Sequence, residues 1–331
     1  MPKFGLLGTV MYDEIRTLDG QRFESFGGIL YNVLALAAVA DPSDRLVPFS
    51  WISEEHLERI GREYLDALPS VDRQGLRPHA GGTDTNSLVY VTASSRREIM
   101  QVVAPEIHLR DVEQAAPFDA LLVNFISGHE FASVEAFAKL RSTTVGPIYL
   151  DMHNLGKLRK DGVPVKGHRF MEWPEWFGCV DIVQGNEWEA ERMFDIHPTT
   201  EEDFREVTRR MLAVAGPKIA LLTLGGEGCA VGWRTANGLR FARIPAMPDV
   251  QIVDTTGCGD SFSAAFITEY LRTGDPLRSA VFAATLSGMK CQSKGLDGLR
   301  NLGGARAVMD KAYGGLLAKI DGGWQGAELL T

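Results

Sequence analysis

The chain has 331 residues, 45% of them hydrophobic, with a formal net charge of -9 and a pI near 5.4. A chain of this size can bury a large α/β core, and its acidity makes nucleic acid and anionic membranes poor general partners. No apolar run reaches the roughly 18 residues of a membrane span, and the four cysteines form no CxxC pair. We therefore expect no membrane anchor, zinc site or disulfide framework. The N-terminus lacks the pattern of a cleaved signal peptide, which predicts a cytoplasmic protein.

Apolar runs that end in polar or glycine-containing turns recur along the chain and predict β-strands. These runs cover residues 4–10, 120–125, 148–150, 181–183, 219–224 and 252–253. Helical patterns, such as those at 134–140 and 204–214, lie between most of them. This alternation predicts one α/β domain over residues 1–331, with a mainly parallel doubly wound sheet and helices on both faces. Ligands of such sheets bind beyond the carboxyl ends of the strands, where the polar turns would gather.

Two regions, residues 14–26 and 83–103, break this alternation and look like β-structure with polar faces. The second contains a hairpin signal around the polar turn at 94–97. Both regions flank the early strands, so we expect a small β lid over the ligand site, with a plain surface hairpin as the alternative. Another hairpin is predicted between Val231 and Phe241, with Asn237 and Gly238 at its turn.

The most informative stretch is residues 254–260, Asp-Thr-Thr-Gly-Cys-Gly-Asp, which follows the apolar run 250–253 and precedes a helical pattern. Strand, glycine-rich turn and helix are therefore predicted. Asp260 would lie in this turn, whose backbone N–H groups form an anion site. A carboxylate in an anion site is costly unless the carboxylate handles a proton or a metal. The stretch thus suggests phosphoryl transfer, although Gly-x-Gly-Asp alone also fits an ordinary helix start. Backbone N–H groups from three residues would form an anion site strengthened by the helix macrodipole: Gly257, Cys258 and Gly259.

The whole string resembles the signature of the PfkB (ribokinase-like) carbohydrate kinases, where the pattern is usually Asp-Thr-x-Gly-Ala-Gly-Asp. Cys258 replaces the usual alanine. Cysteine is small and mostly apolar, so we favour a size-tolerated change over a redox switch. The resemblance implies a ribokinase-like fold and ATP-dependent phosphorylation of a hydroxyl, with Asp260 as base. It also implies that residues 257–259 form the anion hole and that Thr256 lies at the nucleotide.

Two further elements match the family's pattern in order. Residues 27–32, Gly-Gly-Ile-Leu-Tyr-Asn, resemble its Gly-Gly-x-x-x-Asn element. The resemblance implies that Gly28, Asn32 and Asp13, expected at the end of the first strand, bind sugar hydroxyls. Without the resemblance, Gly-Gly would indicate helix packing and Asp13 an ordinary turn acid.

The Asn-x-x-Glu element is matched by Asn186 and Glu189. In the family this pair organises Mg²⁺, its waters and phosphate oxygens, and Mg²⁺ prefers such hard oxygen ligands. On its own the pattern would indicate only a helix start.

The turn Thr-Leu-Gly-Gly-Glu-Gly at residues 223–228 resembles a family turn that lies along the nucleotide, which implies contacts from Thr223, Gly225 and Gly228. The alternative is a tight turn into the next strand. Residues 287–298 loosely resemble the family's closing loop, near the adenine and a monovalent-cation site.

Residues 51–61 lack the Gly-x-Asp-x-x-Gly stretch that the family usually carries after the first helix, which leaves the substrate subgroup open. The loop at 157–169 holds five basic residues and one acid. Such a patch could meet a phosphate-bearing substrate, but a solvated loop is the favoured interpretation.

The resulting hypothesis is an ATP- and Mg²⁺-dependent kinase, with a monovalent cation as a further candidate, whose partner is a sugar or sugar-like alcohol. A homodimer formed through the lid is plausible. One alternative is a non-catalytic sugar- or nucleotide-binding member of the fold, and another is a nucleoside kinase. An NAD-dependent oxidoreductase is weaker, because residues 5–10 do not form Gly-x-Gly-x-x-Gly.

Overall fold

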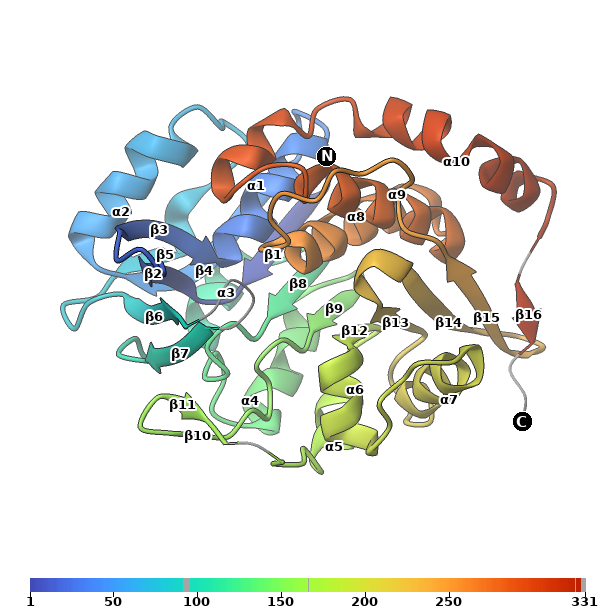
Figure 1. Ribbon diagram of the computed structural model, residues 1–331, viewed down its shortest axis with the longest axis horizontal. Helices are drawn as coiled ribbons and strands as arrows, with labels where there is room; N and C mark the ends of the chain where they lie inside the picture. Colours follow the sequence, from blue (N-terminus) through green and yellow to red (C-terminus); the bar gives the residue numbers. More distant parts are fainter. Residues whose placement is uncertain (92–95, 166, 325, 329–331) are drawn as a thin grey trace.

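The computed structural model describes residues 1–91, 96–165, 167–324 and 326–328, and its main feature is a ten-stranded sheet (Figure 1). The strands run parallel from one edge to β13, and the last three continue antiparallel. The predicted mainly parallel α/β fold is thus confirmed. In spatial order the strands are β16 (Ala327–Glu328), β15 (Gly238–Ile244), β14 (Cys229–Thr235), β13 (Ile219–Thr223), β12 (Ile182–Asn186), β9 (Ile148–Asp151), β8 (Ala120–Asn124), β1 (Lys3–Leu7), β4 (Arg45–Ile52) and β5 (Leu76–Pro78).

Helices cover both faces of this sheet (Figure 1). Successive strand residues alternate between the two cores, so that Leu6 packs in one and Leu7 in the other. One face carries α1 (Ile29–Val39), α2 (Glu54–Ile60), α8 (Cys258–Thr273), α9 (Pro276–Lys290) and α10 (Ala305–Asp321). The other carries α3 (Leu109–Ala115), α4 (Val134–Ala138), α5 (Trp173–Phe177), α6 (Glu187–Phe194) and α7 (Glu201–Met211).

A separate four-stranded sheet lies beside α2 in Figure 1. We call it the small sheet. The regions 14–26 and 83–103 contribute to it. Residues 92–95, which include half of the predicted turn at 94–97, lie outside the described residues. A short hairpin packs against its edge strand β7. The small sheet has the order β3 (Arg22–Gly28), β2 (Val10–Arg16), β6 (Asp84–Tyr90) and β7 (Arg96–Gln101), and the hairpin consists of β10 (Arg159–Lys160) and β11 (Val163–Pro164).

The segment 51–61 supports the small sheet. The His56 ring on α2 lies 4.3 Å from the Tyr12 ring and 5.2 Å from the Phe26 ring, measured between centroids. Its Nδ1 is 2.8 Å from the Thr83 hydroxyl at the start of β6. Residues that depart from the family's usual pattern therefore pack directly under the small sheet.

Two local predictions need correction. Residues 250–253 form no strand, and Ile252 and Val253 are 65% and 47% exposed. The edge of β13 is already occupied by β14, so the apolar run lies outside the sheet, where Val253 N–H donates to the Cys291 carbonyl. Asp13 does not end the first strand, because β1 stops at Leu7 and Asp13 lies within β2 of the small sheet.

The predicted hairpin between Val231 and Phe241 is confirmed by the pairing of β14 with β15. The helix predicted after the glycine-rich turn is also confirmed as α8, which ends before Gly274. None of the helices in the described part of the chain is long and apolar enough to cross a membrane.

Candidate active site

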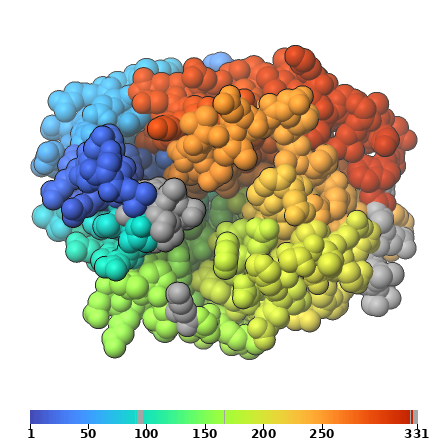
Figure 2. All heavy atoms as spheres, viewed as in Figure 1, coloured from blue at the N-terminus to red at the C-terminus, as the bar shows by residue number. Residues whose placement is uncertain are grey.

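Polar residues end four adjacent parallel strands of the large sheet. Asn124 pairs in register with Asp151, and Asn186 with Thr223, so β8, β9, β12 and β13 present them side by side. The space-filling view shows a hollow on this face, with the small sheet on one side, the orange segment that includes α8 above and α6 below (Figure 2). We call this row of residues the carboxyl edge.

The start of α8 requires a glycine at position 257. Gly257 caps the helix with φ at 80°, and a Cβ there would lie 2.1 Å from the Tyr31 ring. Both the left-handed backbone and the close approach exclude other residues. The Cys258 N–H already donates to the Thr255 carbonyl at 3.2 Å, so this member of the predicted anion hole is partly engaged.

Asp260 lies in the first turn of α8 and is 9% exposed. Its Oδ1 accepts a hydrogen bond of 2.7 Å from Asn124 Nδ2. Burial raises the pKa of this carboxyl to about 6, and the Asn124 hydrogen bond opposes the shift. Asp260 is thus a fixed carboxylate that binds a proton more tightly than an ordinary aspartate does.

Asn32 was expected to bind sugar hydroxyls, but it is fully buried in α1. Its Nδ2 donates to the Asp260 carbonyl at 3.0 Å and to Ser263 Oγ at 2.8 Å. Its Oδ1 accepts from Asn124 Nδ2 at 3.0 Å. All three of these hydrogen bonds are to protein groups, so the Asn32 amide connects α1 to Asp260 and Asn124.

Asp13 and Asp260 both lie within electrostatic range of Tyr31. A Cβ on Gly27, next to Gly28, would lie 2.9 Å from Asp13 Oδ2 and 3.4 Å from the Tyr31 ring. Burial raises the pKa of Tyr31, and the charges of Asp254, Asp260 and Asp13 add to the shift. Asp13, which is half-buried in the small sheet, is therefore one of the acids around Tyr31, together with Asp260.

Gly28 caps α1 with φ at 65°, and a Cβ there would lie 2.2 Å from the Thr9 carbonyl. Glycine is therefore required where β3 passes into α1. Gly28 sets the path of the backbone between the small sheet and the carboxyl edge.

Asn186 and Glu189 form a capping box at the start of α6. Glu189 Oε2 accepts from Asn186 N at 2.8 Å, and Oε1 accepts from Asn186 Nδ2 at 3.0 Å. Burial raises the pKa of Glu189 to about 7. In the described residues, no three His, Cys, Asp or Glu side chains are grouped to hold a metal ion by themselves. A buried carboxylate beside a phosphate site still fits Mg²⁺, which is usually held by one or two carboxylates, phosphates and waters.

Asp151 lies within electrostatic range of both Glu189 and Asp260. Burial raises its pKa well above the usual range, with the charges of Glu189 and Asp260 adding to the shift. Gln184 Nε2 donates to Asp151 Oδ2 at 2.8 Å and lies 3.4 Å from the Gly259 carbonyl. Gln184 thus connects the strand ends to the glycine-rich turn.

Three of the predicted nucleotide residues, Thr223, Gly225 and Gly228, lie at the end of β13 and in the turn after it, whereas Thr256 lies in the turn before α8. Thr223 is paired with Asn186, and Gly225 begins an exposed helical turn with φ at 50°. A Cβ on Gly228 would lie 2.1 Å from the Ile244 carbonyl, so Gly228 serves packing against β15. Thr256 is exposed, and its N–H donates to Asp254 Oδ1 at 2.9 Å.

Sequence reasoning missed Lys290, which is completely buried at the end of α9. Its Nζ donates to the Ser293 carbonyl at 3.0 Å and lies 4.0 Å from Asp254 Oδ2. Residues 287–298 were expected near a monovalent cation. The Lys290 side chain lies among these residues, and the monovalent cation stays a prediction.

Sequence reasoning also missed Asn124 and Gln184. A lone amide at the end of an apolar strand was the only available signal for each. Cys258 was noted from the sequence, and burial raises the pKa of its thiol to about 12, which supports the size-tolerated interpretation over a reactive thiolate.

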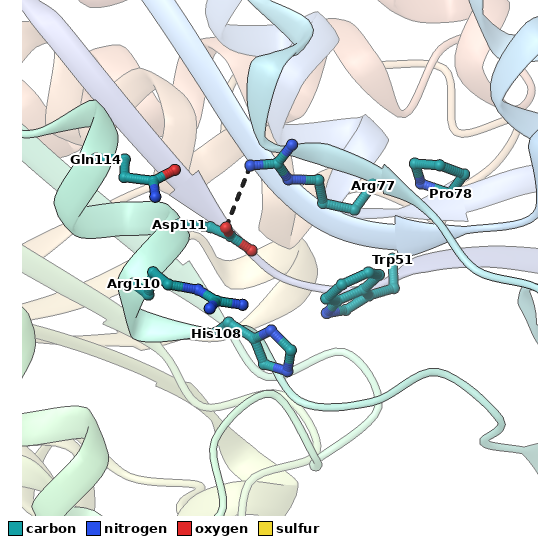
Figure 3. Close-up of a pocket in the computed structure, with 7 residues that line it drawn as sticks. All are labelled: Trp51, Arg77, Pro78, His108, Arg110, Asp111 and Gln114. Atoms are coloured by element: carbon teal, nitrogen blue, oxygen red, sulfur yellow. Dashed lines mark hydrogen bonds and ion pairs between the residues drawn. The ribbon is translucent and has the colours of Figure 1, made fainter.

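A surface hollow of about 450 Å³ lies elsewhere, between the end of β4, β5 and α3 (Figure 3). Arg77 donates to Asp111 across it at 3.2 Å, and Arg110 points toward His108 and Trp51. None of the predicted site residues lines this hollow. Its lining consists of Trp51, Arg77, Pro78, His108, Arg110, Asp111 and Gln114.

Comparisons with known proteins find similar kinases. The sequence model of the pfkB family carbohydrate kinases matches residues 159–300. A ribokinase of Lactococcus lactis is 33% identical over 124 residues, which cover 37% of this chain and 36% of that protein. A cytidine kinase of Thermococcus kodakarensis is 26% identical over 83% of this chain and 91% of its own length.

The solved structure of Arabidopsis thaliana ribokinase complexed with ribose and ATP superposes with a TM-score of 0.71. It is 18% identical, and the superposition covers 93% of this chain and 98% of that chain. This likeness shows a ribokinase-like fold. The first curated relatives are matched over only about a third of their length, at 36%, 36% and 38%.

Proposed function

Because the chain belongs to the PfkB (ribokinase-like) family of carbohydrate kinases, we propose that it transfers the γ-phosphoryl group of ATP to a hydroxyl of a sugar or sugar-like alcohol. The observation that carries this proposal is the placement of Asp260. Its carboxylate is held by Asn124 at 2.7 Å, directly after a glycine turn at a helix N-terminus.

In the proposed reaction, Asp260 accepts the proton of the attacking hydroxyl. The new O–P bond forms as the bond between the γ-phosphorus and the bridging oxygen breaks, and ADP leaves with that oxygen. A pKa of about 6 keeps Asp260 ionised at neutral pH while making it a stronger base than an ordinary aspartate. The backbone N–H groups of Gly257 and Gly259 and the α8 dipole stabilise the charge on the phosphoryl group.

The remaining predicted residues take supporting roles in this proposal. Asp13 accepts hydrogen bonds from acceptor hydroxyls, and Gly28 shapes the neighbouring backbone. Asn32 is a positioning residue for Asp260. Mg²⁺, held near Glu189, would neutralise phosphate charge when bound. The donor site consists of Asn186, Thr223, Gly225, Gly228 and Thr256.

The test compares wild type with Asp260→Asn in an ADP-release assay over sugars, nucleosides and inositols. We expect the variant to fold and to lose turnover by at least about 10²-fold, because a positioned base contributes roughly 10²- to 10⁴-fold. Circular dichroism and a melting curve check the fold. Near-normal turnover in a folded variant would remove Asp260 from the mechanism.

A nucleoside kinase is the second candidate, because similarity to the cytidine kinase extends over 91% of that protein. Turnover with nucleosides, and not with free sugars, would favour it. A non-catalytic binding protein would instead bind a ligand from the same panel without releasing ADP. The cytoplasmic location and a dimer formed through the small sheet stay predictions.

A further inference from the structure

Three basic side chains from separate segments gather next to the carboxyl edge. Lys157 lies in the loop after β9, Arg159 in the β10–β11 hairpin, and Arg192 on α6. Each of the three lies within electrostatic range of the other two. We call these residues the basic cluster.

The solvated loop that the sequence favoured for residues 157–169 holds for Lys160 and Arg169, which are exposed, but not for the two loop residues of the basic cluster. The Arg159 side chain is only 10% exposed, and Lys157 and Arg192 are half-buried. Burial is the main cause that lowers the pKa of both Lys157 and Arg192. Holding three cations out of water is unfavourable unless anions or hydrogen-bond acceptors compensate.

The protein's own acceptors compensate only in part. Arg159 Nη2 lies 3.2 Å from Glu98 Oε1 and donates to Asn154 Oδ1 at 3.4 Å, and Arg159 Nη1 donates to the Gly162 carbonyl at 3.2 Å. Arg192 Nη2 donates to the His153 carbonyl at 3.4 Å. Arg159 Nε and Arg192 Nη1 are buried and have no hydrogen-bond partner within the described residues. Glu189, the other nearby acid, already uses both oxygens in its capping box. The cluster therefore has spare donors and excess positive charge, which an oxyanion would satisfy.

The position of the cluster indicates which ligand supplies the anion. The β10–β11 hairpin is attached to the small sheet, because Met100 N–H donates to the Gly162 carbonyl at 3.1 Å and Arg159 pairs with Glu98. On the other side, Arg192 follows Glu189 by less than one helical turn. The cluster thus bridges the small sheet, which carries Asp13, and the carboxyl edge.

We propose that Lys157, Arg159 and Arg192 bind an acidic group of the acceptor, so that the acceptor is a phosphorylated or carboxylated sugar. This inference rests on the proposed kinase function and names its substrate class. Asp13 lies in register with Asn86 and Met100 across the small sheet, toward the hairpin that carries Arg159. An acceptor at Asp13 would therefore extend toward the cluster, whereas Thr223, Gly225 and Gly228 of the predicted donor site lie at the end of β13 and in the turn after it. Phosphate and carboxylate share the chemistry, since arginine pairs with both through two parallel hydrogen bonds.

The experiment measures kcat/KM for matched acceptors that differ in one acidic group, namely fructose with fructose 6-phosphate and glucose with glucuronate. Wild type is expected to prefer the acidic member of at least one pair by at least about tenfold, and the pair preferred identifies phosphate or carboxylate. Arg192→Gln and Lys157→Gln are expected to bring that ratio close to one. Arg169→Gln is the matched control, because Arg169 lies in the same loop but is exposed and paired with Asp195.

Three kinetic outcomes would overturn the proposal. Wild type could show no preference for an acidic acceptor, or the variants could lower kcat/KM equally for both members of a pair. The variants could also raise KM for ATP alone, which would assign the cluster to the donor. Lys157→Gln keeps the test decisive if Arg192→Gln fails to fold.

A binding measurement separates this inference from the kinase proposal. Inorganic phosphate, titrated in the presence of ADP, should raise the melting temperature of wild type and of Arg169→Gln more than that of Arg192→Gln. If no acceptor is phosphorylated but this difference appears, the anion site stands and the kinase proposal fails. If ADP is released but phosphate stabilises all three proteins equally, the anion site is wrong and the kinase proposal stands.

Discussion

Most of the acidic and amide side chains at the carboxyl edge of the large sheet are more deeply buried than Asp13 and Glu14 of the small sheet. At the edge, Asn124, Asp151 and Asp260 are buried and hydrogen-bonded to protein groups. In the small sheet, Asp13 is half-buried and Glu14 is exposed. A preorganised edge suits chemistry that depends on fixed charges, whereas an open sheet leaves room for acceptors of different shape. Changes at the edge should therefore affect turnover and stability, and changes in the small sheet should affect substrate choice.

The largest expected effect at the edge is that of Gly257→Ala. The new Cβ would meet the Tyr31 ring at 2.1 Å on a backbone with φ at 80°. Left-handed strain and overpacking each cost about 1 to 3 kcal/mol, so we expect a loss of about 2 to 6 kcal/mol in the free energy of unfolding. Denaturant unfolding measures it, and turnover should fall with it.

Gly274→Ala is the matched control at the other end of α8. Gly274 has φ at 66°, but nothing lies within 4 Å of its Cβ position. The free energy of unfolding of Gly274→Ala should fall only by the cost of the left-handed strain, about 1 kcal/mol. Equal losses in the two variants would show that the Tyr31 contact does not restrict position 257.

Lys290→Met should have the next largest effect, because it removes the buried charge that faces Asp254. Hydrogen bonds to charged groups contribute about 1.5 to 3 kcal/mol, and we expect a loss of that size in the free energy of unfolding. Lys294→Met, at an exposed position four residues on, is the control.

Asp260→Asn should change how stability depends on pH. Because the pKa of Asp260 is about 6 in the folded state, above the ordinary value of 3.8, the folded protein binds this proton more tightly than the unfolded chain does. The stabilisation that proton binding at Asp260 gives the folded state is present below about pH 4 and is lost as pH rises through 6. The free energy of unfolding of the variant, relative to that of wild type, should therefore rise by roughly 2 kcal/mol between pH 4 and pH 8. Unfolding curves at several pH values check this, and a constant difference would contradict it.

The sequence predicted the parallel sheet, helix α8 and the β14–β15 hairpin, because each depends on local periodicity or turn residues. It did not predict the roles of Asn124, Gln184 and Lys290. Each is a single polar residue in an apolar context, and its role arises from segments distant along the chain. For example, Asn124 contacts Asp260, 136 positions away. The strand predicted at residues 250–253 was wrong for a related reason, since an apolar run does not reveal whether a sheet edge is free to accept another strand.

The smallest expected effect is at the surface hollow of Figure 3, outside both compared regions. Arg110 is exposed there and points toward His108 and Trp51. Arg110→Ala should change the free energy of unfolding by less than about 0.5 kcal/mol, as is usual for exposed positions, and kcat/KM by less than about twofold. The same assays with Arg192→Gln provide the contrast, because both changes remove one positive charge. A larger loss of activity in Arg110→Ala would mean that net charge, and not the position of the basic cluster, attracts the acceptor.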